Sequence, residues 1–461
     1  MGVVIQDDQW PVARLIPISS ASGIEAQERR AASALLAVMS AVNEFGRALV
    51  KPLGAPAGKI ETFIEIPFKL SDGRSIRPDG IITVSRGSKS WGAIVETKVA
   101  AASLEREQID AYLDLARELG FEAVLSISNH YVTSSMAYPI EVDKRKKRRV
   151  ALHHWSWIDV LTEAVLQRRH RGVSDPDQAY ILNELIRYLK DERSGAVSLG
   201  SMGPSWTAVK DGAREQTLRR NDDHVAAVTA RWDDLIRYLG LELTMELGRD
   251  VRQVVSREER EPDARQQALR ESLASTGRLY AQLQVPNVAG ILEITADLRS
   301  RQITVGTTLP APQEGRTKGR VSWLLRQLQN APDTLKITTK AARSSATYAA
   351  SLSAARENAE VLYPEANREI KGFGLSLTRN MGLKRDAGKG SFIESVISTT
   401  EDFYQQVLQN LRPWKASPPK LPRKDEAADE VPAEVPPELV PPVEAARAEG
   451  DVAATQRQVS I

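Results

Sequence analysis

Two carboxylates and one ammonium group lie close together in the first quarter of the chain. Asp79 directly follows Pro78, and the segment Glu96-Thr97-Lys98 ends the apolar run that comes next. Hard cations such as Mg²⁺ prefer carboxylate, carbonyl and water oxygens, and they keep several of their waters. Asp79 and Glu96 can therefore hold Mg²⁺ or Mn²⁺. Lys98 can orient or help to deprotonate a metal-bound water, or stabilise charge that builds on a phosphate.

A predicted hairpin carries the aspartate of this set. Glu61–Leu70 and Ser75–Val84 have the pattern of two strands, joined by an Asp-Gly turn at Ser71–Arg74. The proline before Asp79 suits a strand edge or a bulge. We therefore expect the carboxylate of Asp79 to turn away from the hydrogen-bonded ladder.

A predicted buried strand carries the other two groups. The short apolar run Trp91–Val95 is typical of a central strand that is covered on both faces. Glu96 and Lys98 lie two residues apart at its end, with Thr97 between them. Because side chains alternate along a strand, Glu96 and Lys98 share one face of the sheet.

Helices and strands follow one another on both sides of these strands. A strand-helix-strand unit of this length requires a parallel, right-handed crossover. The sequence therefore predicts an α/β fold, with a mixed sheet flanked by helices. In chain order, the further predicted elements are a helix over Ile24–Val50, a helix over Leu104–Leu119 closed by Gly120, strands over Phe121–Asn129 and Val150–Trp155, a helix from the Ser156 cap to about His170, and a helix over Gln178–Glu192.

This order of elements, together with Pro78-Asp79 and Glu96-Thr97-Lys98, resembles the PD-(D/E)XK nuclease superfamily, whose fold is restriction-endonuclease-like. The resemblance covers residues from about 20 to 190. It implies a metal-dependent hydrolase of phosphodiester bonds, acting as an endonuclease or an exonuclease. It also implies a bacterial role in restriction, phage defence or DNA repair.

The resemblance implies two more site residues. Many members carry a Gln-x-x-x-Tyr pair on the helix after the second half of the motif, and Gln108 and Tyr112 match it. Gln108 would then line the metal site; the alternative is an ordinary surface residue. Many members also carry a glutamate on the first helix. Glu25, Glu28 and Glu44 are candidates, and Glu28 is preferred because it lies on the exposed side of the first turns.

The same residues also have plainer interpretations. Asp79 can be a turn residue. Glu96 and Lys98 can form a solvated ion pair, which contributes about 0 to 1 kcal/mol. Three functions therefore stay open, because a fold does not dictate an activity. They are a metal-dependent nuclease acting on DNA or, as the less favoured substrate, RNA; a catalytically silent nuclease-like scaffold that binds nucleic acid or a protein; and an α/β protein unrelated to nucleic acid.

Composition sets the outer limits. The chain has 461 residues, which predicts two or three domains. Charged residues make up 26% and hydrophobic residues 42%, as in ordinary globular proteins. The absence of cysteine excludes disulfides, zinc–cysteine sites and thiol catalysis. Because we find neither a signal peptide nor an apolar run of roughly 18 to 20 residues, we expect a cytoplasmic protein with no membrane partner.

Changes in composition divide the chain into three parts. Residues 1–195 form the nuclease-like domain, and Ser194–Ser205 has the composition of a linker. Residues 206–414 form a second α/β or α+β domain, and 415–461 form a Pro-, Glu- and Ala-rich tail that we expect to be disordered. A homodimer is common among relatives that cut both strands. A protein partner bound through the second domain or the tail also stays open.

The second domain has its own pattern of elements. Two short strands flank a polar turn and predict a hairpin. The predicted elements are a helix over Asn221–Leu239, the hairpin strands Ile291–Thr295 and Gln302–Gly306, a helix over Gly319–Gln329, a strand over Thr334–Thr339, and a helix over Ser391–Leu411.

One basic run can add affinity for nucleic acid. The formal net charge is only +2, so the local distribution of charge matters more than the total. The run lies between two predicted strands of the same sheet, where phosphate contacts would give salt-dependent binding. The alternative is a solvated hairpin tip. The candidate nucleic-acid-binding residues are Lys144, Arg145, Lys146, Lys147 and Arg148.

Overall fold

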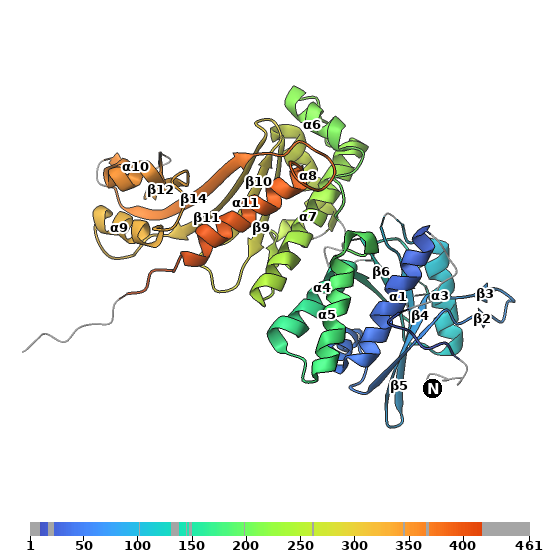
Figure 1. Ribbon diagram of the computed structural model, residues 1–461. Coiled ribbons are helices and arrows are strands. Elements are labelled where there is room, and N and C mark those ends of the chain that lie inside the picture. The colour runs from blue at the N-terminus through green and yellow to red at the C-terminus, as the bar shows by residue number, and fades with distance from the viewer. Residues whose placement is uncertain are drawn as a thin grey trace, which may run out of the picture. The chain divides into compact units, whose positions relative to one another are not determined.

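A computed structural model describes residues 10–16, 23–100, 102–130, 138–143, 145–146, 150–197, 199–260, 262–343, 346–365 and 368–416. The described residues up to Trp414 form one compact unit. This unit contains a five-stranded sheet, a seven-stranded sheet and a two-stranded ribbon, with helices beside them (Figure 1). The predicted α/β class is confirmed at this level, whereas the predicted domain boundaries stay predictions.

The five-stranded sheet has the order β1-β4-β5-β6-β7. β1 (Lys59–Ile64), β4 (Gly80–Arg86) and β5 (Lys89–Thr97) are antiparallel neighbours. β6 (Ala123–Ser128) and β7 (Ala151–Ser156) continue the sheet in parallel. The predicted parallel arrangement around the central helix is therefore confirmed, and the sheet is mixed.

Helices cover both faces of this sheet. α3 (Arg106–Leu119) contributes to the core on one face. α1 (Gly23–Ala41), α2 (Asn43–Val50), α4 (Trp157–Val165) and α5 (Pro176–Lys190) contribute to the core on the other. Figure 1 shows α1 and α5 beside one another. The sheet thus forms the middle of three layers.

Buried side chains of β5 alternate between the two cores. Ala93 and Val95 belong to the core that contains α1 and α4, whereas Ile94 belongs to the core that contains α3. Because strand side chains have a period of two, Glu96 follows Ile94 onto the α3 face and Thr97 follows Val95.

The first predicted helix is interrupted. Ile24–Val50 was expected to be continuous, but Val42 has extended dihedral angles (φ −107°, ψ 93°), so α1 ends and α2 starts there.

No single helix among the described residues is long and apolar enough to cross a membrane; α1 reaches that length only together with Asn43–Leu53, to which it is bent by 109°. The predicted ends of two other helices are confirmed. Gly120 closes α3 with φ 81°, and Ser156 caps α4.

The predicted hairpin strands are each broken near the aspartate. Glu65 has φ 52°, so β1 ends at Ile64, and a separate ribbon forms from β2 (Phe68–Lys69) and β3 (Ser75–Ile76). Prolines near both breaks lack the N–H that a ladder requires. The predicted Asp-Gly turn is confirmed at the tip of this ribbon. We call residues 65–79 the ribbon excursion; the backbone N–H of Glu65 donates to the carbonyl of Asp79 at 3.3 Å and closes it.

The seven-stranded sheet has the order β13-β12-β14-β11-β10-β9-β8, with antiparallel pairing between all neighbours. The predicted hairpin is confirmed as β10 and β11, and the predicted strand near residue 336 is β12. The strands are β8 (Arg252–Val254), β9 (Arg278–Gln284), β10 (Leu292–Asp297), β11 (Gln302–Pro310), β12 (Lys336–Ala341), β13 (Thr347–Ser351) and β14 (Ile370–Asn380).

Helices pack on this sheet around three aromatic residues. Trp206 and Phe392 have ring centroids 4.4 Å apart, and Trp232 lies 6.1 Å from Phe392. The three predicted helices are present as α7, α9 and α11, whereas α8 and β14 were not predicted. The helices are α6 (Trp206–Glu215), α7 (Asp223–Leu247), α8 (Pro262–Thr276), α9 (Thr317–Gln327), α10 (Leu352–Glu357) and α11 (Phe392–Gln406).

The segment expected to be a linker is packed. Ala196, Leu199 and Met202 are buried, and Ser201 forms an isolated bridge with Asp386. Small and polar residues dominate this segment. Its apolar side chains are nevertheless packed: Ala196 lies in the core that contains α1, and Leu199 and Met202 lie in the core of the seven-stranded sheet. Composition alone did not reveal these contacts.

Candidate active site

A cavity of about 180 Å³ opens at the end of β5. The five residues predicted from the sequence all line it: Glu28, Asp79, Glu96, Lys98 and Gln108. They come from α1, the ribbon excursion, β5 and α3, so the cavity joins four segments of the chain. The other lining residues are Glu25, Arg29, Glu65, Arg77 and Pro78.

The backbone of the next strand holds Asp79 in the cavity wall. Its Oδ2 accepts hydrogen bonds from the backbone N–H and the hydroxyl of Thr97, both at 2.7 Å. Burial raises the pKa of Asp79, although the bonds from Thr97 oppose this. Gly80 lets α1 approach closely, because a Cβ there would lie 2.3 Å from Cδ1 of Leu36. Neither Thr97 nor Gly80 was predicted as a site residue.

Glu96 is a buried carboxylate with a partner on each oxygen. Only 1% of the residue is exposed. Oε1 accepts from Nζ of Lys98 at 2.6 Å, and Oε2 accepts from the hydroxyl of Tyr112 at 2.7 Å. Burial, and secondly the charge of Asp79, raise the pKa of Glu96 to about 7, against the opposing effect of Lys98. Glu96 therefore changes its charge near neutral pH.

Gln108 reaches Glu96 through the tyrosine one turn later on α3. Its Nε2 donates to the hydroxyl of Tyr112 at 3.0 Å. Burial and the neighbouring Glu96 raise the pKa of Tyr112, so the phenol keeps its proton and acts as a donor. The predicted glutamine thus lines the cavity, and Tyr112 makes the direct contact with the carboxylate.

Lys98 is an ammonium group held between two glutamates. Nζ lies 2.6 Å from Glu96 and 3.8 Å from Oε2 of Glu28. Burial lowers its pKa, but Glu96 and Glu28 outweigh burial, and the pKa is raised. The backbone is fixed as well, because the indole N–H of Trp157 donates to the Lys98 carbonyl at 2.8 Å. In this arrangement Lys98 is suited to stabilising negative charge rather than to accepting a proton.

The glutamates of the first helices separate into two groups. Glu28 and Glu25 line the cavity. Glu28 was expected on the exposed side of the first turns, but only 13% of its side chain is exposed. Burial raises its pKa, although Lys98 opposes this. Glu44 lies on α2 and accepts from the backbone N–H of Ser174 at 3.2 Å, so it is not part of this cavity.

The sequence interpretation missed three charged residues of the cavity. Arg29 donates to Glu25 at 2.7 Å and contacts Glu65 at 2.9 Å. Glu65 begins the ribbon excursion, and Arg77 lies near its end. Arg77 stands directly before Pro78-Asp79 in the sequence, which was an available signal. Glu65 had none, because its position depends on a left-handed backbone conformation that the sequence did not indicate.

The donor set fits a hard cation. Five carboxylates and three cationic side chains line the cavity, so it carries an excess of two negative charges when all are ionised. Among the residues that the structure describes, no three His, Cys, Asp or Glu are arranged to hold a metal ion together. Mg²⁺ does not require such a cage, because one or two carboxylates with waters and substrate oxygens commonly bind it. Asp79 and Glu96 would be its protein ligands.

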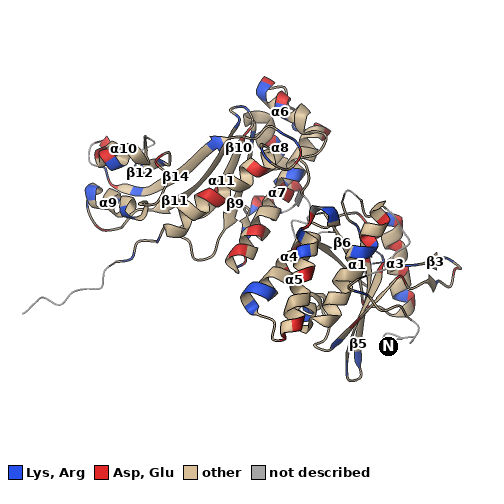
Figure 2. Ribbon diagram, in the orientation of Figure 1, with Lys and Arg blue, Asp and Glu red and all other residues tan. Residues whose placement is uncertain are grey.

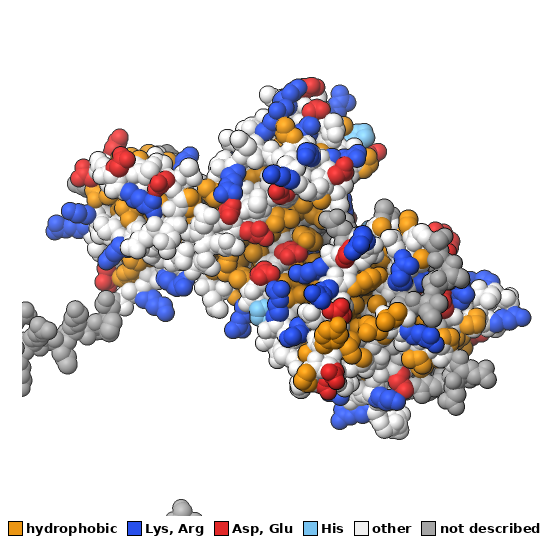
Figure 3. Space-filling model, viewed as in Figure 1, with side chains coloured by type: hydrophobic (Ala, Val, Ile, Leu, Met, Phe, Trp, Pro, Cys, Tyr) orange, Lys and Arg blue, Asp and Glu red, His pale blue; other side chains and the backbone are white. Residues whose placement is uncertain are grey.

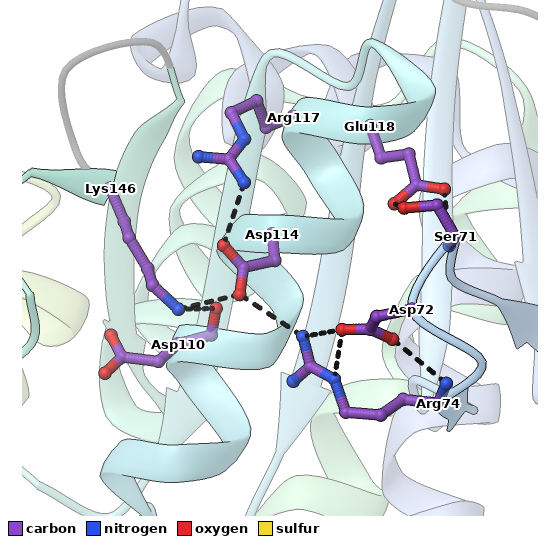
Figure 4. A network of polar contacts seen from close by, with 8 residues as sticks. All are labelled: Ser71, Asp72, Arg74, Asp110, Asp114, Arg117, Glu118 and Lys146. Atoms are coloured by element: carbon purple, nitrogen blue, oxygen red, sulfur yellow. Dashed lines mark hydrogen bonds and ion pairs between the residues drawn. The ribbon is translucent and has the colours of Figure 1, made fainter.

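The basic run is only partly described. Lys144, Lys147 and Arg148 lie outside the described residues, and Arg145 is exposed. Nζ of Lys146 contacts Oδ2 of Asp114 at 2.7 Å and the carbonyl of Asp110 at 3.2 Å, both on α3 (Figure 4). Lys146 is thus paired with acidic α3, and nucleic-acid binding by this run stays a prediction.

Charge is mixed elsewhere on the molecule. Figure 2 shows acidic and basic residues on both α1 and α3, and Figure 3 shows the two signs interspersed on the visible face. This agrees with the formal net charge of +2. Attraction of nucleic acid would therefore depend on local contacts rather than on a general basic field.

Comparison with known proteins gives no relative. No family model, no curated protein and no solved structure matches this chain. The resemblance to the PD-(D/E)XK superfamily consequently rests on the motif residues and the order of the elements. The function has to be argued from the chemistry of the cavity.

Proposed function

We propose that this protein is a metal-dependent nuclease that hydrolyses phosphodiester bonds of DNA. The observation that supports this most is a single cavity lined by Asp79, Glu96 and Lys98. These are the three residue types that the motif requires; Asp79 ends the ribbon excursion, whereas Glu96 and Lys98 lie at the end of β5. A solvated ion pair would not need a glutamate that is 1% exposed.

Each residue has a defined part in this proposal. Asp79 and Glu96 would hold Mg²⁺ or Mn²⁺, which when bound polarises a phosphoryl oxygen and acidifies a bound water. Lys98 places its ammonium beside Glu96, where it stabilises the charge that develops on the phosphate. Tyr112 and Gln108 hold Glu96 in position through two successive hydrogen bonds.

The order of the elements also supports the proposal. A helix, three strands, a helix, two strands and a helix follow one another as α1, β1, β4, β5, α3, β6, β7 and α4, apart from α2 and the small ribbon. This is the order on which the resemblance to the PD-(D/E)XK superfamily rests. In a parallel sheet, sites commonly lie at the carboxyl ends of the strands, and the cavity is at the end of β5.

A cleavage assay tests the proposal. The full chain is incubated with supercoiled plasmid, linear duplex DNA or RNA, with Mg²⁺, Mn²⁺ or EDTA. We expect metal-dependent cleavage of DNA that is lost in Asp79→Ala and Lys98→Ala. Asp177→Asn is a matched control, because it removes an exposed carboxylate on α5 outside the cavity. Cleavage that persists in EDTA, or equally in Asp79→Ala, would contradict the proposal.

A second candidate is a catalytically silent scaffold that binds nucleic acid or a protein. The observation that favours it is that both oxygens of Glu96 already have partners, Lys98 and Tyr112. A metal ligand would have to give up or share one of these contacts. Binding of DNA by the wild-type protein, without cleavage under any metal condition, would support the scaffold instead.

A further inference from the structure

The three cations of the cavity differ in their partners. Arg29 contacts Glu25 at 2.7 Å and Glu65 at 2.9 Å. Lys98 contacts Glu96 at 2.6 Å and Glu28 at 3.8 Å. For Arg77, no ion pair or side-chain hydrogen bond with any described residue occurs, although five carboxylates line the same cavity. Its guanidinium is therefore available to a group that enters from outside.

The backbone that carries Arg77 is well fixed. The neighbours Ile76 and Pro78 are both buried, whereas Arg77 itself is exposed. A proline restricts the residue before it to extended conformations, so the direction of the chain at Arg77 is constrained. The side chain of an arginine placed in this way loses little additional backbone freedom when it binds a ligand.

The ribbon that leads to Arg77 is fastened to α3. The backbone N–H and the hydroxyl of Ser71 donate to Glu118 at 2.9 and 3.1 Å. The guanidinium of Arg74 lies 2.7 Å from Asp72 and 3.5 Å from Asp114 (Figure 4). Arg74 is thus committed to carboxylates of the ribbon and the helix. Arg77, three residues later, lies at the base of a ribbon that these contacts hold.

We propose that Arg77 binds a phosphate of the nucleic-acid strand beside the Asp79–Glu96 pair. A guanidinium presents a planar fork of donors that matches two phosphate oxygens, and it stays charged at any working pH. A cavity with an excess of carboxylates repels a phosphodiester unless positive charge faces the strand. This inference rests on the proposed function and adds the residue that contacts the substrate at the mouth of the cavity.

A different role for Arg77 would be to offset the carboxylates without touching the strand. The two roles predict different measurements. A phosphate contact releases counterions, so its loss lowers the dependence of DNA binding on salt by about one unit of log–log slope. A residue that only offsets carboxylates would alter the affinity for the metal and leave that slope unchanged.

The experiment measures binding of the full chain to a short fluorescent DNA duplex across a salt series, with Ca²⁺ in place of Mg²⁺ to slow cleavage. The variants are Arg77→Gln, Arg77→Lys and the control Arg86→Gln, an exposed arginine at the other end of β4. We expect Arg77→Gln to weaken binding about tenfold and to lower the salt slope by about one. Arg77→Lys should keep the slope, and Arg86→Gln should match wild type. Thermal melting of each variant checks the fold.

The outcomes separate this inference from the proposed function. Wild-type cleavage together with unchanged binding and salt slope in Arg77→Gln overturns the role of Arg77 and leaves the nuclease standing. Binding by wild type that weakens in Arg77→Gln supports the role even where no cleavage occurs. A wild-type protein that neither binds nor cleaves the duplex overturns both.

Discussion

Two buried carboxylates, one beside each sheet, are neutralised in different ways. Asp233 on α7 is 2% exposed, and its Oδ1 accepts from two nitrogens of Arg265 at 2.7 and 2.9 Å. Gln266 donates to its Oδ2 at 2.7 Å. Glu96 is buried as deeply but shares Lys98 with Glu28 and has Asp79 close by.

The difference distinguishes a structural ion pair from a site. Burial of a charge costs several kcal/mol unless a partner of opposite sign and further hydrogen bonds compensate for it. Asp233 has both, and Arg265 is as buried as its partner. Burial raises the pKa of Asp233 as it raises those of Glu28, Asp79 and Glu96, so the difference lies in the balance of charge: the cavity at β5 keeps more carboxylates than cations. Unbalanced, perturbed groups of this kind are typical of functional sites.

The largest effect on activity is expected from Asp79→Asn. The amide oxygen can still accept from Thr97, so the fold is retained, but the negative charge for the metal is lost. We expect the cleavage rate to fall on the order of a thousandfold, with an unchanged or higher melting temperature. The rate of plasmid nicking in Mg²⁺ measures this. If Asp79→Asn cleaves within a few-fold of wild type, the cavity at β5 would no longer differ in function from the ion pair of Asp233.

Asp233→Ala is expected to lower the stability of the fold, whereas Asp79→Asn is expected to lower activity. It leaves the guanidinium of Arg265 buried without its main partner, so the free energy of unfolding should fall by about 3 to 5 kcal/mol. Urea denaturation measures this. The double variant Asp233→Leu with Arg265→Met should recover most of the loss, since an apolar pair removes both charges. A loss below about 1 kcal/mol would mean that this pair is not the structural contact inferred here.

Glu96→Gln sharpens the comparison through pH. The pKa of Glu96 is about 7 in the folded protein and 4.5 in the reference state, so the folded state binds the proton more tightly. This contribution to stability is complete below pH 4.5 and is lost as the pH rises to about 7. We expect wild type to lose about 2 to 3 kcal/mol more than Glu96→Gln across that range, from the shift in pKa.

Urea denaturation of the two proteins at several pH values measures this difference. Asp177→Asn should follow wild type, because that carboxylate is exposed. Parallel curves for wild type and Glu96→Gln would show that Glu96 is compensated as fully as Asp233. Added Mg²⁺ should lower the pH at which wild type loses this contribution to stability, since a bound cation favours the charged carboxylate.

The smallest effect is expected from Tyr112→Phe. The substitution removes one hydrogen bond to Glu96 and leaves the ring in place. We expect the affinity for Mg²⁺, measured from the metal dependence of the cleavage rate, to fall about tenfold. Tyr180→Phe is a matched control, because Tyr180 is exposed on α5. Equal metal dependence in Tyr112→Phe and wild type would mean that the tyrosine does not position the carboxylate.

Local signals made the frame of the first sheet predictable. The Asp-Gly turn, the Gly120 helix end and the Ser156 cap each depend on a few neighbouring residues. The break at Val42 and the left-handed conformation of Glu65 were not predictable, because the sequence around them continues a helical or strand pattern. Tertiary contacts override local propensity at such points.

The candidate site, too, was predictable from local signals but not in its tertiary contacts. Residue type, spacing and the family resemblance predicted five of the residues that line the cavity, but not Arg29, Glu65 or Arg77. The hydrogen bonds of Thr97 to Asp79 and of Tyr112 to Glu96 were not predictable, because they join segments whose approach is set by packing. The partners of Arg29 depend on the same packing.

Because Gly80 has no Cβ, α1 packs closely against the sheet at this position. The methyl of an alanine at this position would lie 2.3 Å from Cδ1 of Leu36, so this buried leucine side chain would have to move. The same helix carries Glu28 into the cavity, so this change in packing would act on one wall of the cavity without altering any ionisable group. A single methyl group would thus change the shape of the cavity through packing alone.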